Sequence, residues 1–206
     1  MSMNRRAWWT LLAVILAVGL SACASKPRFN ESTPIYSGTQ PVTSLFIYSF
    51  LDVREQSLGK NFLRELERQL KDELSSHGVQ SRQLSSLDSP YMASFSLGST
   101  QTGYLRTGIS VPVAEVIQDN ASVESASGAS HRLVMFPKLI HRYGDGPPIY
   151  EVNWDLIDLR TGRLNWSVTS STMHGVWLHN DEKPVERAQL MVQGIIEQMK
   201  IGRVLK

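Results

Sequence analysis

Residues 44–79 read SLFIYSFLDVREQSLGKNFLRELERQLKDELSSHGV, and two kinds of periodicity follow one another along them. Residues 43–51 carry apolar side chains on both faces, which is typical of a strand in the middle of a sheet. From about Ser57 to Ser76, leucines recur every three or four residues and therefore lie on one side of a helix with charged flanks. His77-Gly78 is a helix-ending signal, after which the chain is extended again. The stretch predicts a β-α-β unit, whose crossover is normally right-handed.

A β-hairpin is predicted between Ile149 and Met173, where apolar and polar residues alternate on both sides of Arg160-Thr161-Gly162. A three-residue loop with Gly162 in the left-handed conformation and a G1 bulge would set Leu159 opposite Arg163. A two-residue turn would instead mix the apolar and polar faces. The bulged register, which we favour, pairs Leu156 with Trp166, Trp154 with Val168 and Asp155 with Ser167. Its apolar face would join the core and its polar face would meet solvent.

The remaining elements complete an α+β layer arrangement. Residues 132–140 predict another strand, in which Pro137 indicates a bulge or a partly free edge. Pro112 begins a short helix to Asn120, and Pro184 begins the last helix. We expect a single domain over residues 42–206 in the order β-α-β-α-β-β-β-α. Its sheet would be mixed and largely antiparallel, with about five strands and with helices packed on one face.

The N-terminus predicts export. Residues 1–22 have the positive start, the apolar run and the small final residues of a secretory signal. The apolar run is short for a membrane span of ~20 residues, which disfavours an uncleaved anchor. Residues 24–41 are rich in Ser, Pro, Thr and Asn, so residues 23–41 are expected to form a flexible tether.

Cys23 is the only cysteine of the chain, and Leu20-Ser21-Ala22-Cys23 resembles the lipobox of bacterial lipoproteins. The resemblance implies cleavage before Cys23 and acylation of its thiol and its new amine. Ala24 at the next position favours, by the same resemblance, the periplasmic face of the outer membrane. Two or more acyl chains would hold the protein firmly in a bilayer. The lipid is thus the predicted link to the membrane.

The charge balance gives no support to two kinds of binding. Without the two leader arginines, the chain has equal numbers of basic and acidic residues, 19 of each. Nucleic-acid binding and a polybasic membrane-binding segment therefore have no support in the overall charge.

The sequence contains no catalytic motif that indicates an enzyme. No two of the five histidines stand at metal-ligand spacing, and a surface or capping role is expected for each of them; no metal and no cofactor is predicted. Ser57-Leu58-Gly59-Lys60 matches S-x-x-K, but the companion motifs are missing, and Ser57 is instead expected to be a helix N-cap. Glu151 and Asp155 would lie roughly 13 Å apart along one strand, too far for a glycosidase pair.

The segment between Ser85 and Val111 is long for a connection and contains aromatic residues. These side chains either pack onto the domain or contact a partner. The partner-binding surface is predicted to combine this segment with the polar face of the hairpin. Its residues are Tyr91, Phe95, Tyr104, Arg106, Asn153 and Asp155.

Residues 44–79, together with the WDLIDLRTGRLNWS hairpin of residues 154–167, resemble the small α/β domains of several envelope proteins. Among these are the penicillin-binding-protein activator and curli-secretion lipoproteins and the amino-terminal domain of the Tol translocation protein. The resemblance implies a non-catalytic interaction or assembly module of the cell envelope that binds another envelope protein. A small-ligand or lipid-binding lipoprotein is the alternative, and an unrecognised hydrolase is a third.

Overall fold

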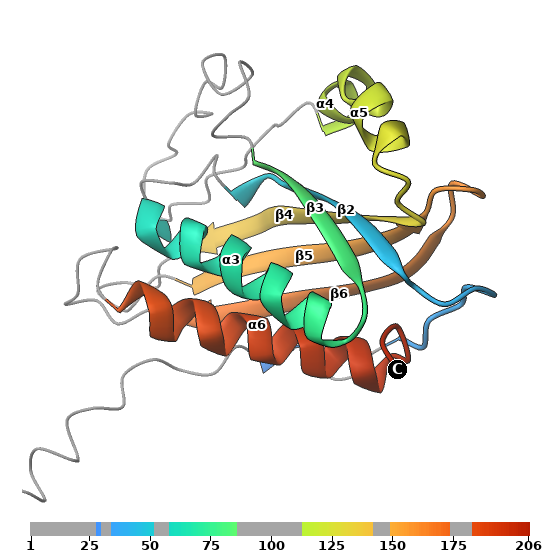
Figure 1. Cartoon of the computed structure of the whole chain (residues 1–206). Helices are drawn as coiled ribbons and strands as arrows, with labels where there is room; N and C mark the ends of the chain where they lie inside the picture. Colours follow the sequence, from blue (N-terminus) through green and yellow to red (C-terminus); the bar gives the residue numbers. More distant parts are fainter. Residues whose placement is uncertain (1–27, 30–33, 52–57, 86–112, 142–148, 174–182) are drawn as a thin grey trace, which may run out of the picture.

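A six-stranded sheet in the order β1-β6-β5-β4-β2-β3 is the centre of the structure (Figure 1). Its strands are β1 (Arg28–Phe29), β2 (Ser44–Ser49), β3 (Gln80–Ser85), β4 (His131–His141), β5 (Ile149–Asp158) and β6 (Leu164–Met173). The helices are α3 (Lys60–Ser76), α4 (Val113–Asp119), α5 (Ala121–Ala126) and α6 (Pro184–Ile201). The computed structural model describes residues 28–29, 34–51, 58–85, 113–141, 149–173 and 183–206.

The sheet is mixed, so the predicted α+β class is confirmed. β2 lies between β3 and β4 and runs parallel to both. The pairs β4–β5, β5–β6 and β6–β1 are antiparallel. The five predicted strands are all present, and β1 is a sixth strand that the sequence pattern does not predict. Register shifts in β4 between Pro137 and Leu139, as the proline indicates.

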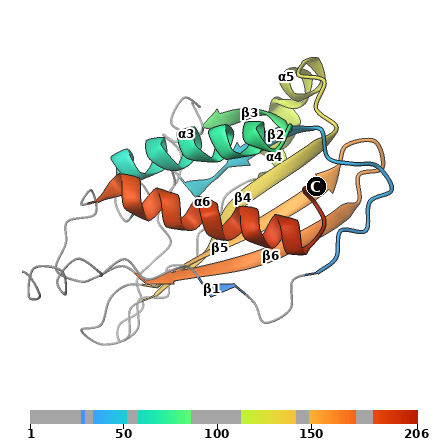
Figure 2. The same cartoon turned by 60° about the horizontal axis from the view of Figure 1, so that its bottom comes forward.

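The main core lies between the sheet and the two long helices. α3 and α6 lie side by side across one face of the sheet (Figures 1 and 2). The predicted leucine stripe of α3, Leu63, Leu66, Leu70 and Leu74, is buried against this face. The sheet contributes alternate residues to the same core, among them Leu45, Ile47, Leu133, Met135, Trp154, Leu156, Trp166 and Val168.

The two short helices correct one part of the prediction, because not every helix lies on the same face. Val116 of α4 is buried with Phe46, Tyr48, Phe50 and Val134, whose side chains leave the sheet on the opposite side from the main core. The chain crosses the sheet in one direction from β2 to β3 and in the other from β3 to β4. Two crossovers of the same hand that run in opposite directions must use opposite faces. The strand order therefore explains the position of α4 and α5.

The hairpin has the predicted register, with Leu156 opposite Trp166, Trp154 opposite Val168 and Asp155 opposite Ser167. Gly162 has φ +67°, the left-handed conformation expected of it. The turn differs in one respect: it closes on Asp158, whose N–H donates to the carbonyl of Arg163 at 3.0 Å, and Leu159 is not paired with Arg163. The extra residue is Asn165, because Ile157 pairs with Leu164 and Leu156 with Trp166.

The helix starts partly match their signals. α3 begins at Lys60 with Gly59 in the N-cap position at φ 90°, which corrects the expectation of an N-cap at Ser57; Ser57 itself lies outside the described residues. α6 begins at Pro184 as predicted, but Val185 at the start of its apolar stripe is exposed. At the other end of α3, His77 Nδ1 contacts the carbonyl oxygen of Glu73 at 2.8 Å, which is the capping role expected for that histidine.

Part of the segment expected to be a tether lies against the domain. β1 pairs Arg28 with Ser171 and Phe29 with Ser170. Further on, the N–H of Tyr36 donates to the carbonyl of Gly202 and that of Ser37 to the carbonyl of Asn165. Cys23 lies outside the described residues, and none of the helices described is long and apolar enough for a membrane span.

Candidate functional site

Two of the six predicted partner-binding residues lie in the described part, and the structure brings them together. Asn153 and Asp155 are neighbours on one face of β5, where Nδ2 of Asn153 donates to Oδ1 of Asp155 at 2.7 Å. Ser167 donates to the same Oδ1 at 2.6 Å, and Thr169 donates to Oδ1 of Asn153 at 3.0 Å. We call Asn153, Asp155, Ser167 and Thr169 the polar ladder. Tyr91, Phe95, Tyr104 and Arg106 lie outside the described residues, so their part in a surface stays a prediction.

The polar ladder lies on the same face of the sheet as the apolar cluster that α4 covers. On β4, Val134 stands opposite Asp155 and Phe136 opposite Asn153. Val134 belongs to the apolar cluster that α4 covers. Among the described residues, β5 contributes only Ile157 to this cluster and β6 contributes none. The bonds within the ladder use Oδ1 of Asp155 and leave its Oδ2 for another donor. The half-buried ladder is therefore an ordered row of hydrogen-bonding groups on a sheet face.

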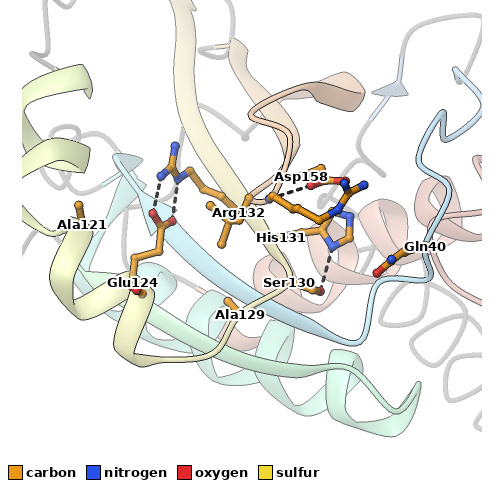
Figure 3. A pocket seen from close by; sticks show the side chains of 11 residues that line it. Gln40, Ala121, Glu124, Ala129, Ser130, His131, Arg132 and Asp158 are labelled. Atoms are coloured by element: carbon orange, nitrogen blue, oxygen red, sulfur yellow. Dashed lines mark hydrogen bonds and ion pairs between the residues drawn. The ribbon is translucent and has the colours of Figure 1, made fainter.

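A second candidate site is an open depression of about 500 Å³ where β4 begins and β5 ends. Its lining comes from the segment before β2, from α5, from β4 and from the hairpin turn (Figure 3). The charged and titratable side chains in it are Glu124, His131, Arg132, Asp158 and Arg160. Its chemistry depends on which of these groups are already engaged within the protein.

Glu124 and Arg132 are engaged with each other. Nε of Arg132 donates to Oε1 of Glu124 at 2.7 Å, and Nη2 donates to Oε2, so the pair is bidentate (Figure 3). The carboxylate raises the pKa of Arg132, chiefly through these bonds. The guanidinium also lies 5.6 Å from the ring centre of Tyr48. Burial, and then the charge of Glu124, raises the pKa of Tyr48 to about 12.

His131 is 2 % exposed, which corrects the expectation of a surface or capping role for this histidine. It belongs to a chain of contacts from Gln40 to Ser44. Oη of Tyr36 donates to the carbonyl oxygen of Gln40 at 2.8 Å and lies 2.7 Å from Nε2 of His131. Nδ1 of His131 lies 2.9 Å from Oγ of Ser130, which donates to the carbonyl oxygen of Ser44 at 2.9 Å.

The number of hydrogen atoms available for these four contacts depends on the protonation state of His131. Carbonyl oxygens at both ends can only accept, so the four contacts need four hydrogens. Two hydroxyl groups and a neutral imidazole supply three, whereas an imidazolium would supply the fourth. Burial lowers the pKa of His131, against a smaller opposite effect of the Asp158 charge. With a neutral His131 ring, the row of four contacts therefore has one hydrogen atom fewer than it needs for four hydrogen bonds.

Asp158 is occupied by the hairpin turn. Its Oδ1 accepts from the backbone N–H groups of Arg160 and Thr161 at 2.8 and 2.9 Å, which is typical of an aspartate at a turn. The bond from Thr161 is the main reason that the pKa of Asp158 is lowered.

The depression is therefore built from groups that serve the fold. Its ion pair, its buried histidine and its turn aspartate all bond inside the protein, which gives no pair of free acid and base groups. Among the described residues, no group of three or more His, Cys, Asp or Glu side chains could hold a metal ion. Sequence reasoning missed His131, because no pattern around residue 131 indicates that this side chain is buried.

The sequence matches no protein-family model and no curated protein. In fold, the chain is distantly similar to bacterial proteins of solved structure. One is PelC from Paraburkholderia phytofirmans, described as a dodecamer, with 13 % identity, 84 % of this chain and 95 % of that chain covered, and a TM-score of 0.42. A variant of the same protein in another crystal form has 13 % identity, coverage of 85 % and 98 %, and a TM-score of 0.41. The lipoprotein GNA1162 from Neisseria meningitidis has 14 % identity, coverage of 79 % and 96 %, and a TM-score of 0.37.

Proposed function

We propose that this chain is a lipid-anchored protein on the periplasmic face of the bacterial outer membrane that binds another envelope protein and performs no catalysis. The signal segment and Cys23 support the anchor and the compartment. The anchor confines the domain to one surface and so raises the effective concentration of any partner there.

The polar ladder is the observation that carries the proposal. Its four side chains hold one another in place, so a partner would meet groups that are already ordered. Oδ2 of Asp155 can accept from a backbone N–H or from a cationic side chain of that partner. Tyr91, Phe95, Tyr104 and Arg106 complete the proposed contact surface as the sequence predicts it.

The depression beside α5 gives the ligand-binding alternative little support. Small-molecule sites are mostly apolar, with a few polar groups that point at the ligand. Here the polar groups of the depression bond one another and the backbone. We therefore do not propose a ligand site there.

The anchor is tested by mass spectrometry of the protein extracted from its membrane. The proposal expects a chain that begins at Cys23 and carries acyl groups, and it expects Cys23→Ala to leave the leader uncleaved. An unmodified thiol in a protein that separates from the membrane would end the proposal.

The contact surface is tested in cells by a photo-crosslinking residue placed at Asn153, with Arg64 on the exposed side of α3 as the matched position. The proposal expects an adduct with one envelope protein from position 153 and none from position 64. Asp155→Arg should remove that adduct, whereas Arg64→Glu should leave it unchanged. Equal adducts from both positions, or an adduct that survives Asp155→Arg, would contradict the proposed surface.

A further inference from the structure

The margin of the sheet at β6 carries three of the four large apolar side chains that are exposed in the described residues. Ile35, Leu164 and Ile201 are 57 %, 55 % and 52 % exposed, and Val185 is the only other large apolar residue of the described part that is so open. The three residues belong to three separate segments of the chain. Each directly precedes, in the sequence, a residue whose backbone is hydrogen-bonded to another of these segments. The N–H of Tyr36 donates to the carbonyl of Gly202 at 2.7 Å.

The second bond that joins these segments runs from the N–H of Ser37 to the carbonyl of Asn165 at 3.0 Å. We call Ile35, Leu164 and Ile201, with the exposed cations Arg163, Lys200 and Arg203 beside them, the β6 margin. Figure 2 shows β1 and the segment that follows residue 34 on this same side of the sheet, next to β6 and the end of α6.

The length of chain before β1 connects this margin with the anchor. Arg28, which pairs with Ser171 of β6, is only five positions after Cys23 in the sequence. At ~3.6 Å per residue, even a fully extended chain reaches only about 18 Å. An acylated Cys23 would therefore keep the part of β6 at Ser170 and Ser171, and with it this side of the sheet, close to the bilayer.

We propose that the β6 margin is the surface with which the domain lies on the bilayer of its own anchor, and that it fits anionic phospholipid. This rests on the lipid anchor of the proposed function. The apolar side chains enter the boundary between headgroups and acyl chains, and the neighbouring cations meet lipid phosphates. The chain without the two leader arginines has a balanced overall charge, so this attraction comes from the local position of the three cations.

The orientation also agrees with the proposed contact surface. The polar ladder lies on a face of the sheet, whereas the β6 margin lies along its edge. A domain that rests on its edge keeps that face free for a partner in the periplasm.

The test uses the full lipidated protein in vesicles of phosphatidylethanolamine with phosphatidylglycerol as the anionic lipid. Cys23 is the only native cysteine, and as a thioether it does not react with thiol labels. A single nitroxide can therefore be placed through Leu164→Cys or Ile201→Cys, with Arg82→Cys on the exposed β3 edge as the matched control. Collision with oxygen, which partitions into lipid, is compared with collision with a water-soluble nickel chelate.

The proposal expects the labels at 164 and 201 to collide more with oxygen and several-fold less with the chelate than the label at 82. Arg203→Glu should restore chelate access at 201, whereas Arg64→Glu should not. Phosphatidylcholine vesicles should also weaken the shielding. Equal chelate access at all three positions would overturn the proposal.

Two further outcomes would also overturn it. Shielding from both reagents, or dipolar broadening between labels of different molecules, would show that a protein or a second copy covers the margin. A failed anchor is distinguishable, because Cys23 would then take up label itself and the protein would not float with the vesicles. In that case the proposed function falls together with this inference.

Discussion

The indole N–H of Trp154 donates a hydrogen bond of 2.9 Å to Oγ of Ser170, and both side chains are completely buried. The two residues belong to neighbouring strands of the hairpin and face the main core. This is a neutral donor matched to a single acceptor in a site closed to water. Polar groups in such sites are costly when left without a partner.

Ser170→Ala should lower the free energy of unfolding by about 1–3 kcal/mol, because the indole N–H would stay buried without an acceptor. Urea unfolding followed by circular dichroism measures the change. Ser171→Ala, at a partly exposed position of the same strand, is the matched control and should have little effect. Additive effects of Ser170→Ala and Trp154→Phe in a double-mutant cycle would show that the bond contributes nothing.

Arg132→Met should destabilise the protein by about 3–5 kcal/mol, because it leaves the buried carboxylate of Glu124 without its bidentate partner. The double variant with Glu124→Leu should recover much of the loss, since both charges are then gone. Denaturant titrations of the single and double variants measure this. No recovery in the double variant would mean that packing beside Tyr48, and not the charge, dominates the effect.

Stability should fall as the pH is lowered below the unfolded-state pKa of His131, which is about 6.5. Burial lowers the pKa of His131 in the folded protein, so the unfolded chain takes up a proton that the folded protein refuses. This contribution is complete above the unfolded pKa and decreases as the pH falls toward the folded pKa.

His131→Gln should remove this part of the pH dependence, and unfolding curves of both proteins between neutral and mildly acidic pH will show the difference. If the native protein instead gains stability relative to the variant on acidification, the fourth hydrogen of the Tyr36–His131–Ser130 chain outweighs the cost of burying the charge.

Gly162→Ala should cost roughly 1–2 kcal/mol through the backbone alone, because φ is +67° and an added Cβ would meet nothing within 4 Å. Gly162→Asn should cost less, since asparagine adopts this conformation more readily. Gly202→Ala is an instructive contrast: its φ of −72° suits alanine, but the Cβ would collide with the indole nitrogen of Trp166. Thermal unfolding compares the three variants, and equal costs for Ala and Asn at 162 would argue against backbone strain.

The parts of the fold that were predicted correctly are those that local periodicity indicates. Alternation of apolar and polar residues in β5 and β6, with Gly162 between them, was enough to pair Leu156 with Trp166. β1 was missed because a strand of two residues has no pattern and depends on the free edge of β6. The side taken by α4 was missed because it depends on the strand order, which periodicity does not encode.

The candidate site follows the same division. Asn153 and Asp155 were predicted to share a face because they are two residues apart in one strand. The burial of His131 was not predicted, because its side chain lies against Tyr36, which is 95 positions away in the sequence. A single histidine before an apolar run does not reveal such neighbours.

The position of β2 between β3 and β4 affects how the polypeptide can fold. Its partners β3 and β4 are made later, and Ser130 follows its partner Ser44 by 86 positions. During synthesis from the N-terminus, β2 would be an apolar strand whose backbone groups stay unpaired on both sides until β3 and β4 have been synthesised. Such a segment is prone to aggregate until it is paired. We expect newly made molecules to depend on a chaperone during this interval, and the hairpin of β5 and β6 to form on its own much faster.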